Sequence, residues 1–190
     1  MEKGYQSRLL LHTCCAPCLV APYSHLQEEG EYDLTGFWFN DNIHPYQEYK
    51  RRLDTFMEWS SKEGFKYLIE KGYHPEPFFQ RVVGREAERC YFCYYFRLKK
   101  TAELAKKNNF DLFSTTLLYS IYQKHDLIKK LGEEIAQNVG ISFYYRDFRE
   151  FWKEGIILSK ECNMYRQPYC GCLYSEKERY CKDWKIQRIW

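Results

Sequence analysis

Three closely spaced thiols follow an apolar run near the start of the chain, in Leu9-Leu10-Leu11-His12-Thr13-Cys14-Cys15-Ala16-Pro17-Cys18. Residues 8–11 are typical of a buried strand and residues from 16 onward of a helix, with Thr13 as its cap and Pro17 in its first turn. At such a junction, backbone N–H groups and the helix dipole favour thiolate over thiol. The run is therefore predicted to be half of a metal site; the alternatives are a strained vicinal disulfide and chance packing.

A second pair of thiols, Cys90 and Cys93, lies within the segment Arg89-Cys90-Tyr91-Phe92-Cys93-Tyr94-Tyr95-Phe96-Arg97. In a helix this spacing puts both sulfur atoms on one face, and Arg97 continues that face. A thioredoxin-type motif would open a helix after a strand, whereas this pair is expected inside a helix. Together with Cys14 and Cys15 it makes four ligands, enough for a zinc site or an iron–sulfur cluster. The spacing alone does not choose between the two.

A third pair stands in Tyr169-Cys170-Gly171-Cys172. Two thiols separated by one glycine can form a tight disulfide in a loop, and strained disulfides are the more easily reduced ones. The alternative is a pair of spare metal ligands. The glycine favours the compact loop.

Strand and helix patterns alternate along the chain and would position these thiols. Strands are expected at residues 8–11, 32–40, 66–69, 110–118 and 141–144, and helices at 16–29, 46–61, 86–107, 126–138 and 148–162. Gly72, Pro75 and Pro77 are expected in a loop, and the tail from Tyr165 is expected to be irregular. The pattern predicts an α/β fold: a single three-layer domain over residues 1–190, with a mostly parallel sheet of about five strands, helices on both faces, and an irregular C-terminal tail, about 165–190, that carries the Cys-Gly-Cys pair.

Composition limits the classes that remain. A chain of 190 residues can build a core without disulfides, so its nine cysteines need another explanation. No signal peptide and no apolar run long enough for a membrane span is apparent, which predicts a cytoplasmic protein in a reducing compartment without a membrane partner. The net charge of +3 does not by itself indicate nucleic-acid binding. Aromatic residues make up 19% of the chain and suit either a packed core or base stacking.

With these pieces in order, the chain resembles the QueH family of epoxyqueuosine reductases. Five motifs carry the resemblance across nearly the whole chain: residues 10–18 (LLHTCCAPC), 40–45 (NDNIHP), 89–93 (RCYFC), 115–118 (TTLL) and 165–172 (YRQPYCGC). Asp41 is a departure, since a proline is as common there. The resemblance implies reduction of the epoxide of epoxyqueuosine to the alkene of queuosine at the wobble position of tRNA anticodons. This is the last step of queuosine biosynthesis and proceeds without cobalamin.

The resemblance also implies roles for the thiols. Cys14, Cys15, Cys90 and Cys93 would bind a [4Fe-4S] cluster, and Cys170 with Cys172 would form a redox-active disulfide. An additional iron is allowed, with Cys18 or Asp41 as its candidate ligand. Cys162 and Cys181 match no motif and are expected to have no role.

The substrate would be a tRNA with a queuosine-type anticodon, whose loop is already single-stranded, and the electron donor is unidentified. The residues expected to bind phosphates are Lys50, Arg51, Arg52, Arg89 and Arg97. The candidate proton donors are Tyr169, His12 and His44, with a packing role the alternative for each histidine. Two rival functions remain at this stage, a zinc-binding RNA module and a thiol–disulfide oxidoreductase.

Overall fold

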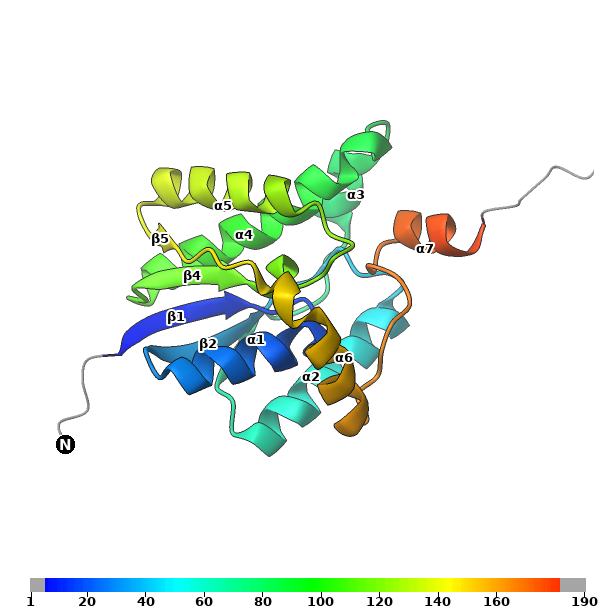
Figure 1. Cartoon of the computed structure of the whole chain (residues 1–190). Helices are drawn as coiled ribbons and strands as arrows, with labels where there is room; N and C mark the ends of the chain where they lie inside the picture. The colour runs from blue at the N-terminus through cyan, green and yellow to red at the C-terminus, as the bar shows by residue number, and fades with distance from the viewer. Residues whose placement is uncertain (1–5, 182–190) are drawn as a thin grey trace, which may run out of the picture.

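A single sheet of five parallel strands forms the centre of the computed structural model, which describes residues 6–181 (Figure 1). The strand order is β3-β2-β1-β4-β5, with β1 (Ser7–His12), β2 (Tyr32–Trp38), β3 (Tyr67–Ile69), β4 (Leu112–Thr115) and β5 (Ser142–Phe143). In the central strand, Leu9 is paired with Leu34 on one side and Leu112 on the other. Leu9 is fully buried, as expected for a strand covered on both faces.

Helices cover both faces of the sheet, which confirms the predicted three-layer α/β fold. Figure 1 shows α1 (Ala16–Glu29), α2 (Tyr46–Glu63) and α6 (Trp152–Glu161) below the sheet, and α4 (Arg89–Lys107) and α5 (His125–Val139) above it. The short helix α3 (Glu76–Val82) packs against α4. None of the helices in residues 6–181 is long and apolar enough to cross a membrane.

The strand order places a topological switch point beside β1. The chain moves outward from β1 through β2 to β3 and then returns to pair β4 with the other side of β1. The connections after β1 and β4 therefore leave the sheet toward opposite faces. In doubly wound folds, ligands bind at such a point, at the carboxyl ends of the strands.

Two elements contradict the predictions. The loop expected around Pro75 and Pro77 contains α3, because Pro75 is its N-cap and Pro77 lies in its first turn, where the missing N–H costs nothing. The tail expected to be irregular contains α7 (Leu173–Tyr180), which begins after Cys172. This helix is short and polar, so it lacks the apolar period that indicates a helix. Residues 182–190 of the predicted tail lie outside the described residues.

The other element boundaries shift by a few residues. The predicted strand at 110–118 ends at Thr115 and is followed by a 3₁₀ turn over Thr116–Leu118. The predicted helix at 86–107 begins with the 3₁₀ turn Glu86–Glu88. The predicted helix at 148–162 begins with the 3₁₀ turn Phe148–Phe151. Thr13 does not cap α1, because its hydroxyl donates to the Leu11 carbonyl at 3.2 Å. Cys15 is the N-cap residue, and within residues 6–181 it makes no side-chain capping bond.

Most of the large rings belong to the core. Trp38, Phe56 and Phe113 are fully buried, and Trp38 stacks on Phe56 with ring centroids 5.3 Å apart. A few rings remain exposed, among them Tyr122 and Tyr91. Within residues 6–181, most of the aromatic side chains therefore belong to the core, and a few exposed rings could stack on a base.

Candidate functional site

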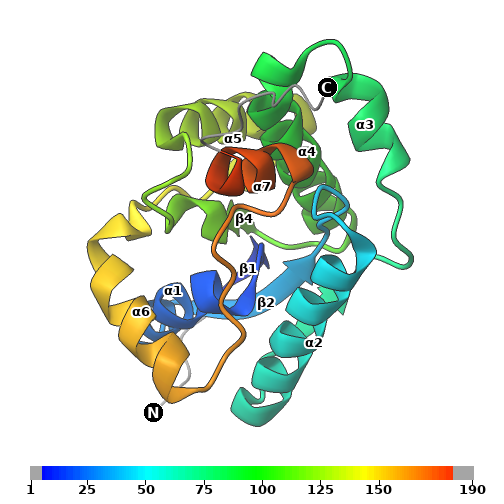
Figure 2. The same ribbon diagram turned by 90° about the vertical axis from the view of Figure 1, so that its right-hand side faces the viewer.

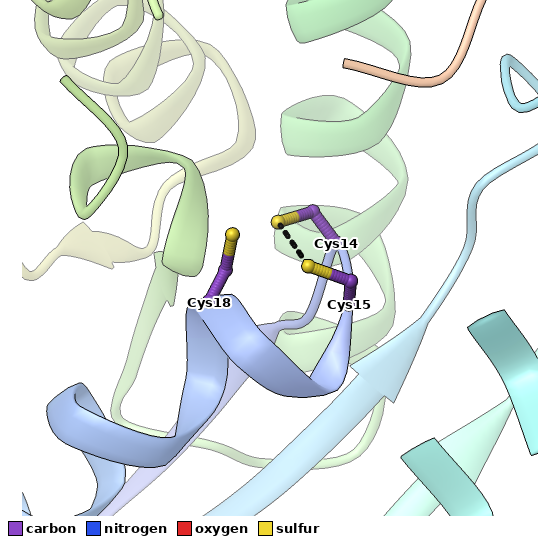
Figure 3. Close-up of side chains that lie close together, drawn as sticks. All are labelled: Cys14, Cys15 and Cys18. Carbon is purple, nitrogen blue, oxygen red and sulfur yellow. Dashed lines mark hydrogen bonds between the residues drawn. The ribbon is translucent and has the colours of Figure 1, made fainter. Parts of the chain in front are cut away.

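Cys14, Cys15 and Cys18 form a compact group of thiols, hereafter the cysteine triad, at the end of β1. Their sulfur atoms lie within 4.8 Å of one another. Cys14 leaves the strand, Cys15 is the N-cap of α1, and Cys18 lies in the first turn of that helix, so that all three sulfurs face the same space (Figure 3). The junction predicted from the apolar run is thus confirmed, and the structure adds Cys18 to the vicinal pair.

The three thiols of the triad share their protons unequally. The pKa of Cys15 lies well below its usual value because its sulfur accepts hydrogen bonds from Cys14 and then Cys18, with help from the charge of Arg52 and the amide of Gln167. The same hydrogen bond with Cys15 raises the pKa of Cys14 to about 11, and hydrogen bonds with Cys14 and Cys15 raise the pKa of Cys18 well above its usual value. Cys15 is therefore the thiol of the triad that loses its proton most readily.

Cys90 and Cys93 lie on α4, as predicted, but in its first two turns rather than inside the helix, and they lie outside the triad. Among residues 6–181 they join no group of three ligand atoms within 4.8 Å of one another. Cys93 is buried, and burial raises the pKa of its thiol. The link between the two sets is Arg97, which is only 3% exposed and donates from Nη2 to the Cys93 sulfur at 2.8 Å. Its pKa is raised despite burial by the nearby Cys93, Cys170 and Cys14, so the guanidinium lies within electrostatic reach of all three segments.

Each of four sulfur atoms receives a hydrogen bond from a separate side chain. Besides Arg97 on Cys93, these donors are Thr116 on Cys14 at 3.3 Å, Gln167 on Cys15 at 3.0 Å and Gln123 on Cys170 at 3.2 Å. Sequence reasoning gave no role to either glutamine. Gln167 and Thr116 fall within the motifs of the resemblance, which could have indicated them, whereas no sequence signal indicated Gln123.

The C-terminal tail brings the third pair of thiols to the same edge of the sheet. Figure 2 shows the segment between α6 and α7 passing in front of the carboxyl ends of β1 and β2. Arg52 of α2 fixes this segment by donating to the carbonyls of Cys170 at 2.9 Å and Tyr169 at 3.3 Å. The Gly171 carbonyl accepts from the backbone of His44 at 2.9 Å. Cys170 and Cys172 are free thiols here, so the predicted disulfide is not formed in this structure.

Two of the five basic residues expected to bind phosphates are buried instead. Arg52 is 2% exposed and pairs with Glu48 at 2.7 Å, while Arg97 bonds to Cys93. The sequence did not show that the side chains of Arg52 and Arg97 bind groups inside the site. Lys50 and Arg51 are exposed, and Arg89 pairs with Glu178.

Burial shifts the pKa values of the three candidate proton donors in different directions. Burial, with Arg97 nearby, lowers the pKa of His12 to about 3, and its ring contacts Thr115 at 2.8 Å and the Phe39 carbonyl at 3.2 Å. Burial lowers the pKa of His44 to about 4. Both rings are therefore neutral at pH 7 and suit the packing role. Burial raises the pKa of Tyr169 to about 12, so its hydroxyl keeps its proton.

Fold and site together define an α/β protein with a cysteine-lined site at the switch point of its sheet. A sequence profile described as "Epoxyqueuosine reductase QueH" matches residues 9–178. The chain therefore belongs to the QueH family, as the resemblance predicted, and is an oxidoreductase of the epoxyqueuosine reductase class.

Individual relatives agree with this assignment. The chain is 37% identical over 175 residues to epoxyqueuosine reductase QueH of Dehalococcoides mccartyi, covering 92% of this chain and 96% of the relative. It is 34% identical to the enzyme of the same name from Thermotoga maritima, covering 95% and 96%. The crystal structure of a predicted subunit of a tRNA methyltransferase from Methanocaldococcus jannaschii matches with a TM-score of 0.58 at 12% identity, over 82% of this chain and 75% of that one. At that identity, it is the fold that is shared.

Proposed function

We propose that this enzyme reduces the epoxide of epoxyqueuosine to the alkene of queuosine at the wobble position of a tRNA anticodon, without cobalamin. The observation that carries the proposal is the convergence of thiols from three distant segments around the buried Arg97. Together with membership of the QueH family, this favours redox chemistry at the carboxyl edge of the sheet. Free thiols at this edge fit the reducing conditions of the cytoplasm.

The donor set fits the cofactor that the family resemblance implies. A [4Fe-4S] cluster takes four cysteine thiolates, and we assign Cys14, Cys15, Cys90 and Cys93 to it. Each thiolate of such a cluster binds a different iron, so the four sulfurs need not touch one another. The buried charge of Arg97 and the hydrogen bonds on three of these sulfurs favour the anionic ligand set. When bound, the cluster would supply electrons one at a time.

Cys170 and Cys172 supply the complementary chemistry. Converting an epoxide to an alkene and water consumes two electrons and two protons. Two thiols that close to a disulfide release two electrons and two protons, so the dithiol balances the reaction exactly once per turnover. An external reductant, still unidentified, must then reopen the disulfide. Gln123 and Arg52 position this pair, through the Cys170 sulfur and carbonyl respectively.

An additional iron has better support at Cys18 than at Asp41. The Cys18 sulfur lies with those of Cys14 and Cys15, whereas the Asp41 carboxylate joins no such group among residues 6–181. Burial raises the pKa of Asp41, so its carboxylate is less available as a ligand. We therefore retain Cys18 as the candidate and place Asp41 second.

Reconstitution tests the proposal most directly. The protein, loaded anaerobically with iron and sulfide, should convert epoxyqueuosine-containing tRNA to the queuosine form under a strong reductant. Cys90→Ser and Cys93→Ser should lose both the visible iron–thiolate absorption and the activity, while Cys170→Ser should lose activity and keep the absorption. Cys162→Ser is the matched control, because Cys162 is exposed and lies outside the site. Failure of the loaded wild-type protein to act on this tRNA would refute the function.

The geometry of the triad also favours a second candidate, a zinc-binding RNA module. With zinc–sulfur bonds of about 2.3 Å, sulfur atoms around one tetrahedral ion lie about 3.8 Å apart, and the three sulfurs of the triad are all within 4.8 Å. Metal analysis of protein purified without added metal separates the candidates. Stoichiometric zinc that iron and sulfide do not displace, with no turnover, would favour the module.

A further inference from the structure

A small cavity opens between the loop after β2, helix α3 and helix α4. Its volume is about 90 Å³. Asn42 lines it from the loop, Phe78 from α3, and Cys93, Phe96 and Arg97 from α4. The cavity has aromatic walls, Asp41 and His74 also line it, and Cys93, a thiol that we assign to the cluster, is part of its lining. A group inserted into it would lie beside the redox centre.

Asn42 is the feature of this cavity that the fold does not explain. Its side chain is only 5% exposed, yet neither its Nδ2 nor its Oδ1 atom has a hydrogen-bond partner among the described residues. Burying an amide in this state costs on the order of 1–3 kcal/mol. The neighbouring Asn40 differs, because its Nδ2 atom donates to the Thr13 carbonyl at 2.8 Å and so fastens the loop to the end of β1. An unpaired buried amide on a cavity wall is what a polar ligand would satisfy.

The size of the cavity selects which part of a modified nucleoside enters. An apolar cavity of about 150 Å³ holds a benzene ring. This smaller cavity therefore suits one edge of a small substituent ring rather than a two-ring nucleobase. The base would remain outside the cavity.

We propose that this cavity is the subsite for the oxygenated ring of the substrate, and that the Asn42 amide donates to the epoxide oxygen. The proposal rests on the proposed function and names the residue that recognises the reacting group. An epoxide oxygen only accepts hydrogen bonds, and Nδ2 of Asn42 is an unused donor. Its Oδ1 atom can accept from a hydroxyl on the same ring. Reduction removes the epoxide oxygen as water, so the alkene product would lose this hydrogen bond.

Binding in the absence of reductant isolates this contact from turnover. The loaded wild-type enzyme should bind tRNA with epoxyqueuosine about 10-fold more tightly than tRNA with queuosine, the value of one hydrogen bond. In Asn42→Leu this ratio should fall to about 1, because affinity for the substrate drops while affinity for the product is unchanged. Asn42→Ala also removes the donor and should abolish the preference too. It provides the test if the leucine variant fails to fold.

Ser60→Ala is the matched control. Ser60 is fully buried, its hydroxyl has no partner among residues 6–181, and it does not line the cavity. Its substrate-to-product ratio should equal that of the wild type. A wild-type ratio near 1, or an unchanged ratio in folded Asn42 variants, would overturn the assignment of the cavity. Absence of turnover by the reduced wild-type enzyme would instead refute the proposed function, so the two failures are distinguishable.

Discussion

Gly171 explains why the third pair of thiols is separated by glycine. Its φ is +135°, a conformation that L residues rarely adopt. A Cβ atom built there would lie 3.1 Å from both the Arg52 Nη1 and the Ile43 Cγ1 atoms. The backbone therefore passes close to the guanidinium that binds the carbonyls of Tyr169 and Cys170. The glycine is required by the approach of α2 as much as by the turn itself.

Replacing Gly171 by alanine should therefore cost more than backbone strain alone. We expect Gly171→Ala to lower the free energy of unfolding by about 2–3 kcal/mol, the upper part of the range for strained residues. Gly84→Ala is the comparison, because Gly84 has φ +77° and no heavy atom in the described part of the chain lies within 4 Å of its Cβ position. It should cost about 1 kcal/mol. Equal losses in urea unfolding of the two variants would contradict the close approach to Arg52.

His44 should make the stability of the protein depend on pH. Burial lowers its pKa from 6.5 to about 4, and its ring stacks on Phe79 with centroids 4.4 Å apart. The unfolded chain therefore binds a proton below pH 6.5 that the folded chain does not bind until about pH 4. The free energy of unfolding is therefore unaffected by His44 above pH 6.5 and decreases as the pH is lowered toward 4. At pH 5 the decrease is about 2 kcal/mol.

The variant His44→Phe should remove this share of the acid sensitivity. Urea unfolding at pH 7 and pH 5 should show that the variant loses about 2 kcal/mol less than the wild type over this interval. Ser60→Ala is the control, because it replaces a buried side chain without adding or removing a titratable group and should leave the pH dependence unchanged. Identical pH dependence in the wild type and His44→Phe would show that His44 is not protonated on unfolding.

At the scale of elements, the sequence predicted what depends on local pattern and missed what depends on distant contacts. Continuous apolar runs predicted the buried strands, and helical spacing placed Cys90 and Cys93 on one face of α4. The pattern could not show that Arg52 and Arg97 point inward, because a basic residue in a helix is usually solvated. Nor could it show that Cys18 joins the triad, since this depends on how the first turn of α1 leaves the strand.

Helix α2 is the element that holds the tail over the site. Arg52 and Glu48, four residues apart on α2, are both buried; Arg52 binds the Cys170 carbonyl and Glu48 accepts from the Tyr165 hydroxyl at 2.7 Å. The pair joins two parts of the chain that are far apart in sequence. Its role is to position Cys170, whereas the sequence suggested phosphate binding.

Arg52→Met should release the tail without unfolding α2. We expect faster amide hydrogen exchange in residues 165–172 and an overall stability loss of about 3–5 kcal/mol, because Glu48 is left buried without its partner. Lys50→Met, on the exposed side of the same helix, should change neither by more than about 0.5 kcal/mol. Unchanged amide exchange in residues 165–172 of Arg52→Met would show that other contacts position Cys170 and Cys172.

At the scale of the whole molecule, the basic residues expected to bind phosphates divide into buried and exposed ones. The net charge is only +3, and two of the five arginines and lysines assigned to phosphates from the sequence neutralise sulfur and carboxylate inside the protein. The exposed remainder lies on α2, the helix that carries the tail, where Lys50 is paired with Asp54 at 2.6 Å and Arg51 lies over the Tyr165 ring. Binding of tRNA should therefore depend on a few phosphate contacts beside the site rather than on a general attraction.

A salt titration of tRNA binding follows from this distribution. Each phosphate contact releases counterions, so the logarithm of the association constant should fall linearly with the logarithm of salt concentration. Arg51→Ala should reduce the slope by about 1, because one contact is lost, whereas Arg149→Ala should leave it unchanged, since Arg149 is already paired with Asp147 at 2.6 Å. Arg52→Met should weaken binding, if at all, without changing the slope, because a buried guanidinium releases no counterions. A smaller salt slope for Arg52→Met together with an unchanged slope for Arg51→Ala would show that Arg52, and not Arg51, contacts a phosphate.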